Sequence, residues 1–207
     1  MALACPRERN IQVETTAPAK HEVTSYAYKA SLIGAAHRFE LTDAGLVWHI
    51  AGRSGTWPYA GIASIKLSYR PVSMQAKRFR ADLRDRSGNR LSLLSTSWQT
   101  AALMAAQSEA YRDFIVELHG RMRDAGSNAV LTGGLGRKTY GAALALTALF
   151  AVAMAGLLVR ALTVREWAGA AFLVGFAALF TWQVGGFIRR NQPRAYTFAD
   201  IPRALLP

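Results

Sequence analysis

GAALALTALFAVAMAGLLV occupies residues Gly141–Val159 and contains no charged residue. A second uncharged run, WAGAAFLVGFAALFTWQVGGFI, occupies Trp167–Ile188. At about 1.5 Å per residue, helices of these lengths reach roughly 28 Å and roughly 33 Å, which is enough to cross a hydrocarbon core of about 30 Å. Two helices this apolar inside a soluble bundle would need a larger protein around them. The sequence therefore predicts two transmembrane helices.

The link between the two runs is RALTVRE, residues Arg160–Glu166, and it is too short for anything but a tight turn. We therefore expect an antiparallel helical hairpin. Lys and Arg gather at the opposite end of the two runs, as Arg137, Lys138, Arg189 and Arg190. Because cytoplasmic loops carry an excess of Lys and Arg, we expect a multi-pass protein of the bacterial inner membrane with both termini in the cytoplasm.

Aromatic residues lie near the ends of the two runs. Their amphipathic rings favour the headgroup level of a bilayer, where flanking Lys and Arg side chains also reach. The expected membrane-interface anchors are Tyr140, Trp167, Trp182, Arg137, Lys138, Arg189 and Arg190. Small residues recur four positions apart, as at Ala151 and Ala155, and would allow close helix packing. Gln183 is the one strongly polar residue inside a run, so we expect neither a channel nor a carrier.

The composition of the 207 residues limits the class of protein. The formal net charge of +12 favours an anionic environment, which is a membrane surface, nucleic acid or an acidic partner. The single cysteine, Cys5, excludes an intramolecular disulfide and a cysteine-based zinc cluster. Too few residues precede it for a signal peptide, so lipidation is not expected. Residues 1–25 show neither helical nor strand periodicity and are expected to form a disordered arm.

An alternating apolar pattern begins at about His37 and indicates β-structure. Phe39 and Leu41 alternate with polar residues, and the turn sequence TDAG separates them from the alternating run GLVWHI. Short alternating runs continue to about Ser95, with a further turn at SGN. Six or so antiparallel strands in this order predict a curled sheet or a partly open barrel.

After Ser97, which we interpret as an N-cap, the apolar period becomes helical. Arg121 is expected on the polar face, and Gly126 is expected to end the helix. This helix would cap the open end of the barrel. Glycines in the following stretch predict a flexible connector to the membrane. The apolar face of the helix comprises Tyr111, Phe114, Ile115, Leu118 and Met122.

These patterns divide the chain into five parts. They are a disordered arm (1–25), a β domain with a capping helix (26–126), a flexible connector (127–140), a transmembrane hairpin (141–190) and a cytoplasmic tail (191–207). The overall expectation is an α+β fold in which a curled antiparallel sheet is followed by a two-helix transmembrane hairpin.

The runs FELTDAGLVWHIAGRSGTWPYAGIASIKL and AYRDFIVELHGRM resemble bacterial pleckstrin-homology (PH)-like domains. In that family a strand-rich sheet is capped by a C-terminal helix and is often fused to membrane spans. The final segment, NQPRAYTFADIPRALLP, resembles the endings of uncharacterised proteobacterial membrane proteins. The loop Thr42–Gly45 has an aspartate where lipid-binding PH domains carry clustered cations, and the closing helix lacks their buried tryptophan. The resemblance therefore does not imply phosphoinositide binding.

Cations alternate along two neighbouring predicted strands. If these strands pair, one face carries Lys66, Arg70, Lys77, Arg78, Arg80, Arg84 and Arg86. Such a face could contact anionic lipid headgroups, at about 1 kcal/mol for each cation near the surface. A solvated face that follows the positive-inside bias explains the same pattern. Few aromatic residues interleave the cations, which argues against nucleic acid as a partner.

The sequence contains no catalytic or cofactor motif. The stretch GGLGRK lacks the spacing of a phosphate-binding loop, and the four histidines form no metal-binding pair. Asp82 and Asp85 lie among arginines and are interpreted as ion-pair partners, not as an acid and base pair. We therefore expect no enzyme, cofactor or metal site. The predicted function is a membrane-tethered PH-like adaptor that engages the bilayer and an unidentified membrane or cytoplasmic protein. The alternative is an accessory subunit of a larger inner-membrane complex, with the hairpin packing against partner helices.

Overall fold

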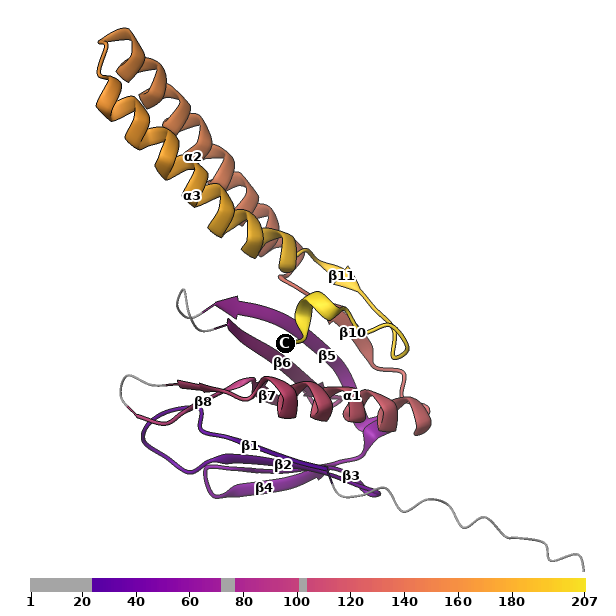
Figure 1. Cartoon of the computed structure of the whole chain (residues 1–207). Coiled ribbons are helices and arrows are strands. Elements are labelled where there is room, and N and C mark those ends of the chain that lie inside the picture. Colours follow the sequence, from indigo (N-terminus) through magenta and orange to yellow (C-terminus); the bar gives the residue numbers. More distant parts are fainter. Residues whose placement is uncertain (1–23, 72–76, 101–103) are drawn as a thin grey trace, which may run out of the picture.

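The structure, a computed structural model, describes residues 24–71, 77–100 and 104–207. It is an α+β fold in which two sheets enclose one helix and two long apolar helices project from them (Figure 1). The helices are α1 (Ser108–Asp124), α2 (Arg137–Thr163) and α3 (Trp167–Arg190). The predicted α+β class is confirmed. Of the predicted arm, residues 1–23 lie outside the described part, and the last two residues already belong to a strand.

The first sheet consists of four antiparallel strands in sequence order. They are β1 (Thr24–Tyr28), β2 (His37–Thr42), β3 (Gly45–Ile50) and β4 (Arg53–Trp57). The turn predicted at TDAG joins β2 to β3, and the Thr42 hydroxyl donates a hydrogen bond to the carbonyl oxygen of Gly45 at 3.0 Å. Phe39, Leu41 and Leu46 are fully buried, so the period of two correctly predicted the inward face.

The second sheet has the strand order β11-β10-β5-β6-β7. Its pairs are antiparallel except for β10 and β5, which run parallel. A small antiparallel pair, β8 (Thr96–Trp98) and β9 (Met104–Ala106), precedes α1. The five strands are β5 (Ile62–Pro71), β6 (Lys77–Asp85), β7 (Arg90–Leu94), β10 (Val130–Gly133) and β11 (Arg194–Ala195).

Helix α1 runs between the two sheets and fills the core (Figure 1). Its predicted apolar face is confirmed, since every one of the five residues is at most 1% exposed. Two tyrosines of β1 reach the edge of the second sheet: the Tyr26 hydroxyl donates to the carbonyl of Leu94 at 2.5 Å, and the Tyr28 hydroxyl donates to the carbonyl of Ser92. These bonds satisfy edge carbonyls of β7 and join the sheets.

The sequence predicted the end of α1 correctly but not its start. Gly126 has a φ of +65°, and the backbone N–H of Ser127 donates to the carbonyl of Met122 at 2.9 Å, which closes the last turn. The interpretation of Ser97 as the N-cap was wrong, because it lies in β8 and the helix begins at Ser108. The short apolar segments of β8 and β9 are too brief to show a period of two.

Arg121 was expected on the polar face and is instead buried, at 6% exposure. Its guanidinium donates to the carbonyl of Leu41 at 3.1 Å and pairs with Glu117 at 2.7 Å. The buried cation is therefore satisfied by a carbonyl at the end of β2 and by a carboxylate on its own helix.

The predicted flexible connector was wrong for most of its length. Residues Val130–Gly133 form β10, which is hydrogen-bonded to β5, and α2 begins at Arg137. The segment predicted as a cytoplasmic tail is part of the β domain, because β11 pairs with β10 and a short 3-10 helix, η2 (Arg203–Leu205), follows. Leu205 is fully buried in the core. Strand pairing across such long sequence separations leaves no pattern in the local sequence. Glycines at the ends of a strand also resemble the glycines of a flexible linker.

Candidate functional site

The two long helices, α2 and α3, are long and apolar enough to cross a membrane. The most apolar 18-residue stretch has a mean hydropathy of 2.4 in α2 and 1.7 in α3. No residue of these two stretches is buried inside the protein. Each helix extends beyond the uncharged run from which it was predicted. The two helices pack against each other, with the ring centroids of Phe150 and Phe180 4.4 Å apart. The protein therefore presents a helical hairpin with an apolar exterior, which suggests a membrane protein.

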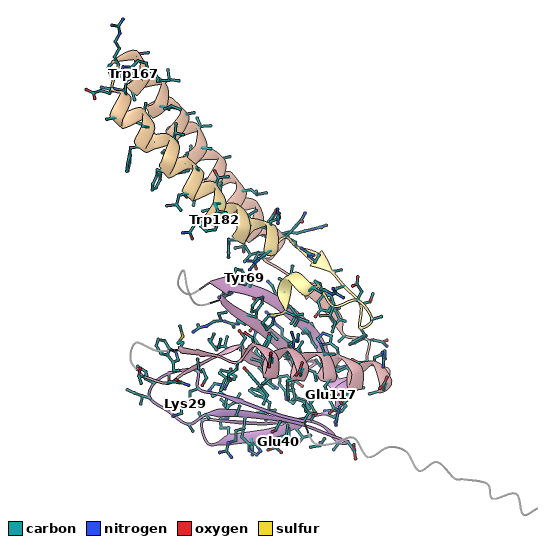
Figure 2. All side chains as sticks on the ribbon, in the orientation of Figure 1. Lys29, Glu40, Tyr69, Glu117, Trp167 and Trp182 are labelled. Atoms are coloured by element: carbon teal, nitrogen blue, oxygen red, sulfur yellow. The ribbon has the colours of Figure 1, made fainter. Side chains whose placement is uncertain are left out.

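The predicted interface anchors lie at both ends of this hairpin. Figure 2 shows Trp167 at the end far from the β domain and Trp182 nearer to it. Both indole rings face outward, at 68% and 76% exposure. At the end nearer the β domain, the charged and aromatic anchors are Arg137, Lys138, Tyr140, Arg189 and Arg190.

The junction between hairpin and β domain is held by backbone hydrogen bonds. The N–H of Gly134 donates to the carbonyl of Leu67 at 2.8 Å, and the N–H of Leu135 donates to the carbonyl of Asn191 at 2.9 Å. The Asn191 side chain is fully buried and accepts a hydrogen bond from the N–H of Tyr69 at 3.1 Å. The chain thus leaves the second sheet after β10 and returns to it at β11, at adjacent points. Hydrogen bonds hold both connections to the hairpin in place.

The two strands that carry the predicted basic face, β5 and β6, pair with each other. Their register places Lys66 opposite Asp82 and Arg70 opposite Arg78, as expected if the two strands pair. Arg70, Arg84 and Arg86 are exposed, whereas Lys66 is half-buried. Lys77 opens β6, but its side chain lies outside the described part of the chain.

Two arginines of this face are engaged by other side chains. Arg80 forms an ion pair with Asp82 at 2.7 Å and donates to the Ser92 hydroxyl at 3.0 Å. The Arg78 guanidinium donates to the Thr96 hydroxyl at 2.9 Å. These contacts lock the outer surface of β6 to β7 and β8. The face is therefore less cationic than its sequence suggests.

A denser group of cations lies at the base of the hairpin. A cavity of about 600 Å³ is lined by the four arginines Arg189, Arg190, Arg194 and Arg203, and also by Phe79, Ser108, Gln192, Ala204, Leu206 and Pro207. Arg189 and Arg190 were predicted to be interface anchors, whereas no binding role was predicted for Arg194 or Arg203. The one signal in the sequence was the high apolar content of RAYTFADIPRALL, which is unusual for a solvated tail.

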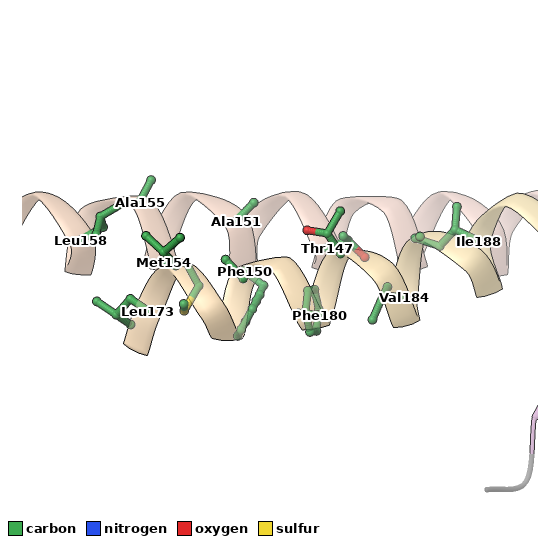
Figure 3. A pocket seen from close by; sticks show the side chains of 14 residues that line it. Thr147, Phe150, Ala151, Met154, Ala155, Leu158, Leu173, Phe180, Val184 and Ile188 are labelled. Carbon is green, nitrogen blue, oxygen red and sulfur yellow. The ribbon is translucent and has the colours of Figure 1, made fainter. Parts of the chain in front are cut away.

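An apolar groove of about 380 Å³ runs along the hairpin between α2 and α3. Figure 3 shows that its walls are formed by small and apolar side chains of both helices, including Ala151, Ala155 and Val184. The Thr147 hydroxyl beside it donates to the carbonyl of Ala143 at 2.8 Å, so it does not need a partner from outside. The groove offers close packing to an apolar occupant and no polar chemistry.

His119 joins α1 to the C-terminal segment. The side chain is fully buried, its Nδ1 donates to the carbonyl of Ile115 at 2.7 Å, and its Nε2 accepts from the Tyr196 hydroxyl at 3.0 Å. Burial lowers the pKa of His119 below its ordinary value of 6.5. The folded protein therefore favours the neutral imidazole.

This lowered pKa predicts acid sensitivity. The stabilising effect of His119 is fully present above pH 6.5, the unfolded value, and is lost as the pH falls through the lower folded pKa. We expect the free energy of unfolding to fall between about pH 7 and about pH 5, and to fall less steeply in a His119→Gln variant. Denaturant unfolding of both proteins across this range measures the difference. His37, whose pKa burial also lowers, is retained in both and serves as the internal control. Equal pH slopes would contradict the assignment.

Among residues 24–71, 77–100 and 104–207, no three His, Cys, Asp or Glu side chains are grouped so that they could hold a metal ion. No protein-family model matches the chain, and no curated protein or solved structure matches it. The resemblance to PH-like domains therefore stays a prediction.

Proposed function

We propose that the chain is a non-catalytic interaction module with a PH-like β domain, tethered by its hairpin to the cytoplasmic face of a bacterial inner membrane. The observation that carries the proposal is the fixed junction. The segment before α2 pairs with β5, and the segment after α3 pairs with β10 and sends Leu205 into the core. A domain fixed in this way is presented to partners at one orientation and one height above the bilayer, which lowers the entropy cost of binding there.

The distribution of cations supports the cytoplasmic side. Arg137, Lys138, Arg189 and Arg190 lie at the domain end of the hairpin, whereas the cations at the far end are Arg160, in the last turn of α2, and Arg165. By the positive-inside bias, this distribution favours a cytoplasmic β domain.

An exposed sheet edge supports a protein partner. Strand β4 is the last strand of the first sheet, and among the described strands it pairs with β3 alone. Its Ser54 and Thr56 side chains are exposed. An extended peptide can add to such an edge through backbone hydrogen bonds, which is a common mode of recognition.

The experiment is site-specific photo-cross-linking in native membranes. A photoreactive residue at Thr56 is expected to give a discrete protein adduct, while one at Ser87, in the exposed turn after β6, serves as the control and is expected to give none. The same cross-linker at Phe172, an exposed residue of α3, probes the hairpin. Absence of an adduct from Thr56 would contradict the proposal.

The groove between α2 and α3 favours a second candidate, an accessory subunit whose hairpin packs against partner helices. Small residues along a groove let helix backbones approach closely. Replacing residues 141–188 with an unrelated apolar hairpin separates the two functions. If the chain is an interaction module, the Thr56 adduct remains after the exchange. If the chain is an accessory subunit, Phe172 gives adducts in the original chain, and the partner is lost after the exchange.

A further inference from the structure

The cavity at the base of the hairpin brings together arginines from separate elements. Arg189 and Arg190 end α3, Arg194 lies in β11, and Arg203 begins η2. None of the four forms an ion pair with a carboxylate among residues 24–71, 77–100 and 104–207. Since like charges repel at close range, this arrangement is stabilised when an anion occupies the cavity.

The arginines are held in place by the fold. Arg190 lies over the ring of Tyr69, with its guanidinium carbon 5.0 Å from the ring centroid. Arg194 belongs to a strand paired with β10, and Arg203 is carried by the turn that buries Leu205. An arrangement of positioned guanidinium groups suits a phosphate, because each group can donate two parallel hydrogen bonds to its oxygens.

Two further features of the cavity fit an anion. Ser108, the first residue of α1, lies in its wall, so the positive end of that helix dipole adds to the field of the arginines. The amide of Gln192 supplies an additional hydrogen-bond donor in the wall. The apolar part of the wall, Phe79 and Leu206, can contact the less polar portion of a ligand.

The position of the cavity at the base of the hairpin favours a lipid as the source of the phosphate. Arg189 and Arg190 follow directly on the apolar part of α3, and Trp182 lies about 12 Å before Arg190 along the helix axis. This is the level at which lipid headgroups meet the hydrocarbon core. We propose that the cavity binds the phosphate group of an anionic lipid of the surrounding leaflet. The inference rests on the proposed membrane tethering and adds a specific ligand class to it.

The test uses the full chain in detergent micelles, titrated with phosphatidylglycerol or phosphatidylcholine and examined by native mass spectrometry. We expect retention of phosphatidylglycerol, and a fall in its affinity of about 30-fold in an Arg194→Gln/Arg203→Gln double variant. An Arg38→Gln/Arg90→Gln double variant removes the same charge from exposed positions of β2 and β7, outside both the cavity and the predicted basic face, and is expected to bind like the wild type. The single variant Arg203→Gln, at an exposed position, replaces the double variant if the latter unfolds early.

Three outcomes would overturn the proposal. They are equal retention of the two lipids, equal losses in the two double variants, and binding of glycerol 3-phosphate as tight as that of phosphatidylglycerol, which would assign the cavity to a soluble phosphate compound. Failure of the proposed interaction function would appear as a missing Thr56 adduct and would leave lipid retention unchanged. The two results are therefore distinguishable.

Discussion

Replacing Leu205 with alanine is expected to lower the free energy of unfolding of the β domain by about 2–5 kcal/mol, the usual cost of truncating a buried leucine. Leu205 is fully buried although it lies beyond the α2–α3 hairpin. The change removes apolar contacts in the core and leaves a cavity beside Gly133, whose backbone the leucine side chain contacts closely. Chemical denaturation of the full chain in detergent measures the loss through tryptophan fluorescence, to which Trp48, Trp57 and Trp98 of the β domain contribute.

The matched control for Leu205→Ala is Val130→Ala. Val130 is an apolar residue of β10 that is 63% exposed, so its truncation is expected to change stability by less than about 0.5 kcal/mol. If Leu205→Ala proved as mild as Val130→Ala, the C-terminal segment would not belong to the core in solution.

Replacing Gly134 with alanine is expected to destabilise the junction by about 1–3 kcal/mol for the positive φ and by a further 1–3 kcal/mol or so for steric overlap. Gly134 has a φ of +82°, and a Cβ there would overlap the backbone carbonyls of Asn191 and Gln192. Relief of that overlap requires β10 to move away from the returning chain. Hydrogen exchange should therefore accelerate at the amide of Leu135, which donates to Asn191.

Gly120 provides the matched control for Gly134. It lies in the middle of α1, has ordinary helical geometry and has open space where a Cβ would be placed. Gly120→Ala is expected to be neutral or to stabilise the protein by up to about 1 kcal/mol. Unchanged exchange at Leu135 in the Gly134→Ala variant would show that the junction is not rigid.

Local patterns were sufficient to predict β2, β3 and β5 to β7, the apolar face of α1 and the two long helices. In each case the residues that form the element also carry its period, as Phe39 and Leu41 do in β2. The turn at Thr42–Gly45 and the helix end at Gly126 depend on backbone preferences that single residues reveal. These features could be predicted because their causes are near in sequence.

The junction could not be predicted in this way. Strand β10 is short and is stabilised by β5, far earlier in the chain, and by β11, far later. The arginine cavity depends on the same long-range pairing, so the sequence showed Arg194 and Arg203 only as isolated charges in an apparent tail. Arg121 was placed on the wrong face because its buried partner, the carbonyl of Leu41, is a backbone group that carries no side-chain signal.

The order of elements along the chain has a consequence for biosynthesis. The second sheet receives β10 before the hairpin is made and β11 only after it, and Leu205 follows later still. During translation the β domain therefore exposes an unfilled core position and an unpaired edge of β10 until both spans have been synthesised. Completion of the β domain therefore follows synthesis of the hairpin, and a chain whose hairpin fails to turn back cannot complete its own β domain.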